Sequence, residues 1–210
     1  MKPICYVETN YLVGVAKGQL LSEGHGDNIV KDVFGDDVAA VIPDVCFMEA
    51  FSNLKHEFRD RKRFHRTLDE RARETRRDHV SESAHELATH LEEAIIKSED
   101  QLGEIELYLF ETVDSFARDA EWIRLNYEIL DENIESQYIS DPTDSLILCC
   151  ILWHARRHPD RPKAFVSANH KDFEGPSVKD LLAGAGVSYF RRTEAAVGWL
   201  RSQLRDQASP

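Results

Sequence analysis

The stretch Ile4-Cys5-Tyr6-Val7-Glu8-Thr9-Asn10 determines the fold class that we expect for this chain. Its first four residues are apolar without a break, as in a short strand that is buried on both faces of a parallel sheet. The apolar run ends at Glu8, Thr9 and Asn10, and a helical pattern follows from Tyr11 to Lys17. The sequence therefore predicts a buried first strand with a polar site at its carboxyl end.

Further strand-like runs occur at residues 38–42, 164–166 and 187–190, and helical patterns separate them. One helix is expected over Ser145–Ala155, with Pro142 in its first turn, and Thr193 is expected to cap a final helix. Strands that alternate with helices predict an α/β fold, a three-layer α/β/α sandwich with a central parallel sheet. In such folds ligands bind at the carboxyl ends of the strands.

The middle of the chain has a long helical signal. From Asn53 to Gly103 there is no proline and glycine appears only at the end, which predicts two long helices or one long hairpin. Residues 105–110 fit either a strand or a helix, and residues 116–130 are expected to be helical. We therefore expect a single domain over residues 1–210, with a helical insertion at 53–130.

The composition is that of a globular protein that does not coat nucleic acid. The chain of 210 residues has 26 Lys and Arg against 38 Asp and Glu, and its formal net charge is -12. No apolar run approaches the roughly 20 residues of a membrane span, and the N-terminus lacks a secretory signal pattern. Cysteines 5, 46, 149 and 150 lie in apolar stretches and are expected to be buried thiols. We therefore expect a cytoplasmic protein that does not enter a membrane.

Four acidic residues, Glu8, Glu49, Asp144 and Asp172, stand near strand ends or helix starts. A parallel sheet would bring them to one edge, where carboxylates repel one another unless divalent cations neutralise them. Oxygen ligands without Cys or His partners favour Mg²⁺ or Mn²⁺ over Zn²⁺. The acidic set therefore predicts a magnesium or manganese site.

Together with their neighbours, these residues resemble the motifs of the PIN-domain ribonucleases, a family that includes toxins of bacterial toxin-antitoxin pairs. The segments that carry the resemblance are Tyr6–Leu12, Ile42-Pro43 followed by Glu49, Asp144–Ile147 and Val166–Phe173. They are similar to the family's opening strand, second strand, third acidic helix start and last acidic signature. The resemblance covers residues 1–52 and about 138–205, and gives no support to the helical insertion.

The resemblance implies a metal-dependent endoribonuclease that hydrolyses RNA phosphodiester bonds, with an antitoxin protein as a partner. Its Mg²⁺ or Mn²⁺ would be held by Glu8, Glu49, Asp144 and Asp172. Asp141 is either an auxiliary ligand or a helix cap before Pro142. The neutral residues Thr9, Asn10, Ser167 and Asn169 are expected either to hydrogen-bond the carboxylates or to contact and position the substrate phosphate.

One departure from the family matters, because Glu8 stands where the family usually has Asp. The added methylene moves the carboxylate by about 1.5 Å, and the octahedral geometry of Mg²⁺ tolerates displacement poorly. An alternative function is therefore a catalytically degenerate PIN-like module that binds RNA or protein. A different metal-dependent phosphohydrolase is a third reading, but the chain has no paired-aspartate DxD start.

Within the helical insertion, residues 55–79 carry a net charge of +4. Candidate RNA contacts in this segment are Arg59, Arg61, Lys62, Arg63 and Arg66. The alternative is a solvated helix with i, i+4 pairs at Glu57/Arg61 and Asp69/Arg73. An apolar stripe follows at helical spacing and is expected to pack internally, with a homodimer or antitoxin interface as the alternatives. Its members are Val80, Ala84, Leu87, Leu91, Ala94 and Ile95.

Overall fold

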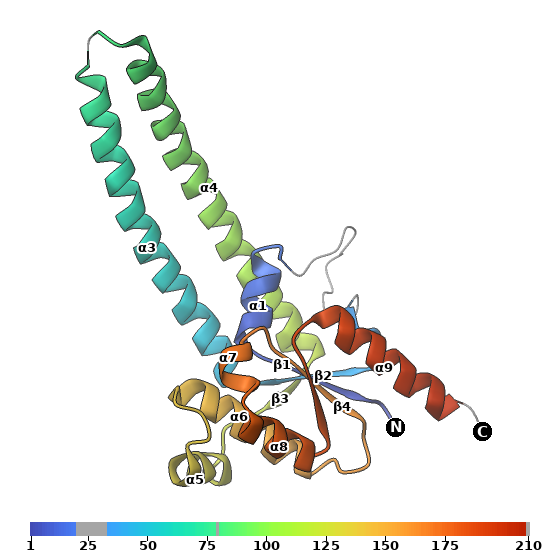
Figure 1. Cartoon of the computed structure of the whole chain (residues 1–210). Coiled ribbons are helices and arrows are strands. Elements are labelled where there is room, and N and C mark those ends of the chain that lie inside the picture. Colours follow the sequence, from blue (N-terminus) through green and yellow to red (C-terminus); the bar gives the residue numbers. More distant parts are fainter. Residues whose placement is uncertain (20–32, 79, 209–210) are drawn as a thin grey trace. The chain divides into compact units, whose positions relative to one another are not determined.

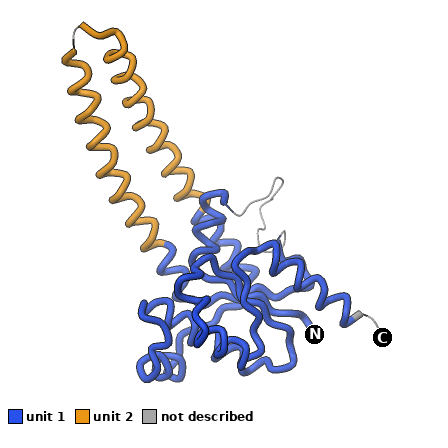
Figure 2. The backbone as a smooth tube through the Cα atoms, in the orientation of Figure 1, with its two compact units in different colours: residues 1–50, 109–210 blue, residues 51–108 orange. Residues whose placement is uncertain are grey.

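The structure, a computed structural model, describes residues 1–19, 33–78 and 80–208. It divides into two compact units (Figure 2): unit 1 comprises Met1–Ala50 and Leu109–Pro210, and unit 2 comprises Phe51–Tyr108. Unit 2 is shorter than the insertion expected at 53–130, because residues 109–130 belong to unit 1. His79, the last residue of the predicted basic segment, lies outside the described residues.

Unit 1 contains a five-stranded sheet in which every strand pair is parallel (Figure 1). Its strands are β1 (Ile4–Val7), β2 (Ala39–Pro43), β3 (Glu121–Ile123), β4 (Lys163–Val166) and β5 (Val187–Phe190). They lie in the order β3-β2-β1-β4-β5. The α/β class with a central parallel sheet is therefore confirmed.

The strand order creates a switch point at the carboxyl ends of β1 and β4. The chain passes from β1 to β2 and β3 on one side, and then to β4 and β5 on the other. Because Val7 pairs with Val166, the residues that follow β1 and β4 emerge side by side. Open α/β sheets bind ligands in the crevice outside such neighbouring strand ends.

Helices lie against both faces of the sheet, an arrangement compatible with a three-layer sandwich. The helices of unit 1 include α1 (Thr9–Ala16), α5 (Tyr127–Ser136), α6 (Pro142–Arg156), α7 (His170–Phe173), α8 (Pro176–Gly184) and α9 (Thr193–Ala208). On one face, Tyr6 of β1 hydrogen-bonds His154 of α6. On the other, Phe190 of β5 contacts Trp199 of α9, with ring centroids 5.6 Å apart.

The core of unit 1 lies between these layers. All of β1 is buried, and α6 buries most of its apolar residues, as its sequence predicts. Cysteines 5, 46, 149 and 150 are all buried and free, which confirms the interpretation of them as packed thiols. Over the described residues, no helix has both the length and the hydropathy that a membrane span requires.

Two elements differ from the sequence predictions. Residues 116–130 do not form one helix, because a preceding helix ends at Asp119 and the edge strand β3 follows before α5. This strand was missed because Glu121 and Trp122 are exposed, so that no buried apolar run marks it. Thr193 does not act as a helix cap, since it is the first residue of α9 and its buried hydroxyl has no hydrogen-bond partner in the described structure.

Unit 2 is a pair of antiparallel helical segments, which belong to α3 (Val45–Arg76) and α4 (Glu82–Asp119). Residues 105–110, open between strand and helix in the sequence, are helical. Arg61 donates to Gln101 at 2.9 Å, and Arg76 pairs with Glu92 at 2.6 Å across the two helices. The expected pairs Glu57/Arg61 and Asp69/Arg73 are present at 3.4 and 2.6 Å. The prediction of two long helices is confirmed.

The apolar stripe of unit 2 is only partly covered. Ala84, Leu91 and Ile95 are half-buried and Ala94 is exposed, while Val80 is 97% and Leu87 51% exposed. The prediction of internal packing is therefore wrong for Val80, Leu87 and Ala94. Two helices cover only one side of each other, so part of a wide apolar stripe stays in solvent.

Candidate metal-binding site

The acidic residues predicted from the sequence gather at the carboxyl edge of the sheet in unit 1. Glu8 directly follows β1, Asp172 lies in α7 after β4, and Asp144 is in the first turn of α6. Glu49 lies in the part of α3 that belongs to unit 1. Glu49 and Asp144 act electrostatically on Glu8, and Asp172 acts on Asp144. The acids therefore form one coupled group.

Glu8 is the most buried member of this group, with 1% of its surface exposed. Its Oε2 accepts the backbone N–H of Asn10 at 2.7 Å and so caps α1. Its Oε1 is buried and has no hydrogen-bond partner among the residues that the structure describes. Burial, together with the charges of Glu49 and Asp144, raises the pKa of Glu8 to about 7. The N–H of Asn10 and the hydroxyl of Ser167 act in the opposite direction and lower this pKa. A cation would provide the partner that Oε1 lacks, with Oε1 as its ligand.

Glu49 is half-buried and held by Thr9. The Thr9 hydroxyl donates a hydrogen bond to Oε2 of Glu49, and Thr9 itself is buried. Burial, and secondarily the charge of Asp141, raises the pKa of Glu49. Because residue 9 adjoins residue 8, α1 positions both Glu8 and the partner of Glu49. The hydrogen bond to Glu49 is one of the two roles expected for Thr9.

Asp144 is held in the same way by Asn169. The Asn169 side chain donates from Nδ2 to Oδ2 of Asp144 at 3.0 Å, while its backbone N–H donates to Ser167 Oγ at 3.0 Å. Burial raises the pKa of Asp144 to about 6, and the charges of Asp141, Asp172 and Glu49 act in the same direction. Ser167 and Asn169 thus connect the end of β4 to the start of α6.

Asp141 is the N-cap of α6. Its Oδ1 accepts the backbone N–H groups of Thr143 and Asp144 at 2.8 and 3.2 Å. Asp141 is exposed, and its charge raises the pKa of both Glu49 and Asp144. The cap, one of the two roles expected from the sequence, is confirmed.

The spacing of the acids limits how a cation could be held. Among the described residues, no three of these carboxylates place an oxygen within 4.8 Å of one another. Mg²⁺ is commonly held by one or two carboxylates and keeps several waters. The free Oε1 of Glu8 and the hard oxygen donors fit Mg²⁺ or Mn²⁺ in this partly hydrated form.

A second group of ligand-type side chains, absent from the sequence prediction, joins β3 and α6. Side-chain atoms of Glu121, His154 and His158 lie within 4.8 Å of one another. Both ring nitrogens of His154 are engaged, by Tyr6 Oη at 2.8 Å and Glu121 Oε1 at 3.0 Å, and burial lowers the pKa of His154. This network, of which His154 is the buried member, ties β1 and β3 to α6. It was missed because the sequence pattern did not show β3, and therefore did not place Glu121.

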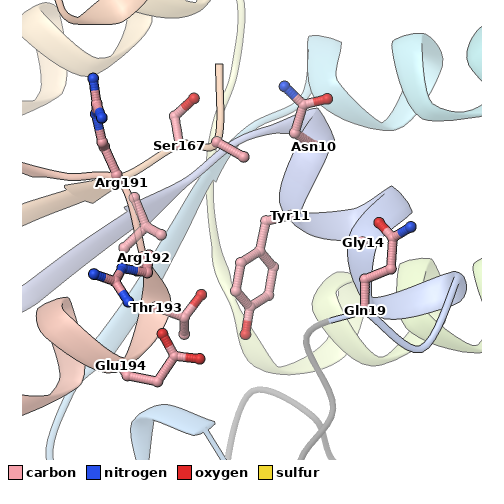
Figure 3. Close-up of a pocket in the computed structure, with 11 residues that line it drawn as sticks. Asn10, Tyr11, Gly14, Gln19, Ser167, Arg191, Arg192, Thr193 and Glu194 are labelled. Atoms are coloured by element: carbon pink, nitrogen blue, oxygen red, sulfur yellow. The ribbon is translucent and has the colours of Figure 1, made fainter. Parts of the chain in front are cut away.

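A pocket of about 280 Å³ borders the acidic residues, between α1, the end of β4 and the start of α9 (Figure 3). We call it the α1–α9 pocket. Asn10 and Ser167 line both this pocket and the acidic edge, whereas Tyr11 and Thr193 belong to the pocket alone. Tyr11, an aromatic residue directly after a polar strand end, was not among the predicted site residues because it fits a buried helix face equally well.

The candidate RNA contacts lie in unit 2 and differ in availability. The guanidinium of Arg61 is used between the two helices, where it donates to Ser98 and Gln101. Arg63 is exposed and pairs with Asp60 at 3.9 Å. Arg59, Lys62 and Arg66 are exposed, with no ion pair to any described residue. These last three are the free cations of the predicted set.

Comparisons of the chain with models of protein families, with curated proteins and with solved structures find no match.

Proposed function

We propose that this protein is a metal-dependent endoribonuclease with a PIN-like fold. One observation carries the proposal: at the switch point of the sheet, Glu8 is buried among other acids and has an oxygen without a partner in the described structure. A buried carboxylate in this state gains most from a cation. The order of the acidic motifs along the chain supports the PIN-like assignment, and with it RNA as the substrate.

In this proposal each residue has a defined task. Glu8, Glu49, Asp144 and Asp172 would hold Mg²⁺ or Mn²⁺, directly or through the waters of the ion, and the ion would supply Lewis-acid activation of water and neutralise charge at the scissile phosphate. Thr9 and Asn169 orient Glu49 and Asp144 by hydrogen bonds.

The resemblance to the PIN-domain ribonucleases also supports a proposal about the biological role. We propose a cytoplasmic toxin of a toxin-antitoxin pair, whose second partner besides RNA is an antitoxin protein. The exposed apolar residues of unit 2, such as Val80 and Leu87, are available to such a protein or to a second copy of the chain.

A second candidate is a catalytically degenerate PIN-like module that binds RNA or protein. The observation that favours it is the spacing of the acids. Among the described residues, no three of them place carboxylate oxygens within 4.8 Å of one another. The longer side chain of Glu8, which folds back onto the N–H of Asn10, points the same way.

The substitution Glu8→Asp separates the two candidates. Asp caps helices as well as Glu8 does here, so α1 is preserved while the carboxylate retracts by about 1.5 Å. For an active nuclease we expect Glu8→Asp to change the cleavage rate by less than about tenfold with Mn²⁺. For the degenerate module, we expect a wild-type protein without cleavage and a variant that gains it. The measurement is hydrolysis of an end-labelled RNA.

The matched control is Glu8→Gln, which keeps the length of the side chain and removes its charge. In an active nuclease this variant should lose cleavage and bind Mn²⁺ more weakly. A Glu8→Gln protein that cuts RNA as fast as the wild type would exclude Glu8 from the site.

The free cations of unit 2 give a prediction about RNA affinity. The double substitution Lys62→Glu/Arg66→Glu should weaken binding of single-stranded RNA and lower the slope of log affinity against log salt by about 1.4, or about 0.7 for each lost contact. The measurement is a salt titration of RNA binding in EDTA. Arg201→Glu, an exposed position on α9, is the matched control and should leave the slope unchanged. An unchanged slope in the double variant would show that this helix is only a solvated surface.

A further inference from the structure

The α1–α9 pocket contains two buried hydroxyl groups that the fold does not use. Tyr11 is 3% exposed and Thr193 8% exposed, and neither Tyr11 Oη nor Thr193 Oγ1 has a hydrogen-bond partner within the described chain. Figure 3 shows both hydroxyls at the same end of the pocket, on opposite sides of it. Buried hydroxyl groups are nearly always paired, so a ligand that pairs with both is expected.

The Tyr11 hydroxyl is held in place before any ligand arrives. The Tyr11 ring lies 5.8 Å from the ring of Phe34 and 5.8 Å from that of Phe116, measured between centroids. These contacts fix the ring, so its hydroxyl cannot swing out to water. A fixed donor of this kind reduces the entropy lost when a ligand binds.

The rest of the pocket combines apolar walls with charge at its rim. Val166, Ala168 and Gly14 supply apolar surface, and α9 begins at the pocket with Glu194 in its first turn. Arg192 is exposed and has no ion pair to a described residue, whereas Arg191 pairs with Glu174. Arg192 attracts a phosphate to the rim, against the charge of Glu194, and apolar walls accept a flat ring.

We propose that the α1–α9 pocket binds one nucleotide of the RNA next to the cleaved bond. Its base lies between the apolar walls and is read by the hydroxyls of Tyr11 and Thr193, and its phosphate lies near Arg192. The volume of about 280 Å³ is near the lower end for small-molecule pockets, which suits one nucleotide and excludes a longer segment. This inference rests on the proposed function, because it identifies the nucleotide as part of the substrate.

The experiment measures binding of the four nucleoside 5′-monophosphates to the full-length protein in EDTA, with inorganic phosphate and the free nucleosides as separate probes. Without divalent cations, the result does not depend on cleavage. We expect at least one monophosphate to bind about tenfold or more tightly than inorganic phosphate. Equal affinities for the monophosphates and inorganic phosphate would overturn the proposal.

Variants assign the binding to the pocket. Tyr11→Phe and Thr193→Val each remove one unpartnered hydroxyl and should fold normally, yet each should weaken the best monophosphate by about three- to tenfold. Arg192→Ala should weaken monophosphates but not free nucleosides. Tyr138→Phe, whose hydroxyl bonds Glu132 outside the pocket, is the matched control and should change nothing. Unchanged affinity in Tyr11→Phe and Thr193→Val would overturn the proposal.

A cleavage assay separates this inference from the proposed function. On a pool of RNA sequences, Tyr11→Phe should alter the base preference at one position beside the cut. If the wild type cuts RNA and Tyr11→Phe alters neither base preference nor nucleotide affinity, the pocket proposal is wrong and the nuclease stands. If nucleotide binding follows the expected pattern but no RNA is cut, the pocket binds a nucleotide, whereas the nuclease proposal and the assignment of that nucleotide to a cleaved RNA are wrong.

Discussion

The substitution Asp144→Asn is expected to slow RNA cleavage by about 100-fold or more in the presence of Mg²⁺ or Mn²⁺. Asp144 interacts electrostatically with Glu49, Asp141 and Asp172, so its charge contributes to any cation held among them. Asn has the same shape, and its side-chain oxygen can still accept the hydrogen bond that Asn169 Nδ2 gives to Asp144. The substitution therefore removes charge and leaves the first turn of α6 intact.

The measurement combines hydrolysis of an end-labelled RNA with calorimetric titration of Mn²⁺. Asp172→Asn should weaken Mn²⁺ binding as well, because Asp172 adds its charge to the same site. Asp180→Asn, at an exposed position on α8, is the matched control and should behave as the wild type. If the double variant Asp144→Asn/Asp172→Asn still bound Mn²⁺ and cut RNA normally, these acids would not form the site.

A second large effect is expected in the pH dependence of stability without divalent cations. Burial raises the pKa of Glu8 from 4.5 to about 7, so the folded chain holds this proton more tightly than the unfolded chain does. The resulting stabilisation is complete below pH 4.5 and is lost as the pH rises through 7. For Glu8 alone we expect the free energy of unfolding to fall by about 3 kcal/mol across this window. Asp144, with a pKa raised to about 6, acts in the same direction at lower pH.

The effect of Glu8 is measured by urea unfolding in EDTA from about pH 5 to about pH 8, for the wild type and Glu8→Gln. Their difference isolates Glu8 from groups such as His154, whose lowered pKa makes stability rise with pH. With Mn²⁺ at 100 times its dissociation constant, the wild type should gain about 2.7 kcal/mol. A difference between the two proteins that is flat across the pH range would show that Glu8 does not titrate as described.

The fold could be predicted from the sequence wherever burial was complete. β1 has the predicted bounds because it is a fully buried, uninterrupted apolar run. β5 also has the predicted bounds, although Ser188 interrupts its apolar run and only Val187 is fully buried. α6 was found because Pro142 marks its first turn. β3 could not be found, since it has three residues and two are exposed. The pairing that makes it a strand comes from β2, far away in the chain.

The candidate site, too, could be predicted from the sequence only in part. The sequence placed Glu8 at the end of a strand, and the structure adds that one of its oxygens is buried without a partner in the described residues. Thr9 and Asn169 were predicted either to bond carboxylates or to contact phosphate, and only the folded geometry shows bonds to Glu49 and Asp144. The role of Thr193 was misread because a Thr at a helix start is usually a cap.

The buried cysteines have a practical consequence. Burial raises the pKa of Cys46, and the charges of Glu8 and Glu49 add to this effect, so its thiol is not the reactive thiolate. Alkylating reagents reach such a side chain only when the surrounding packing opens. The rate of alkylation at Cys46, measured by mass spectrometry on the wild-type protein, thus reports how often the packing around the acidic residues opens. A bound cation that ties the carboxylates together should slow that rate.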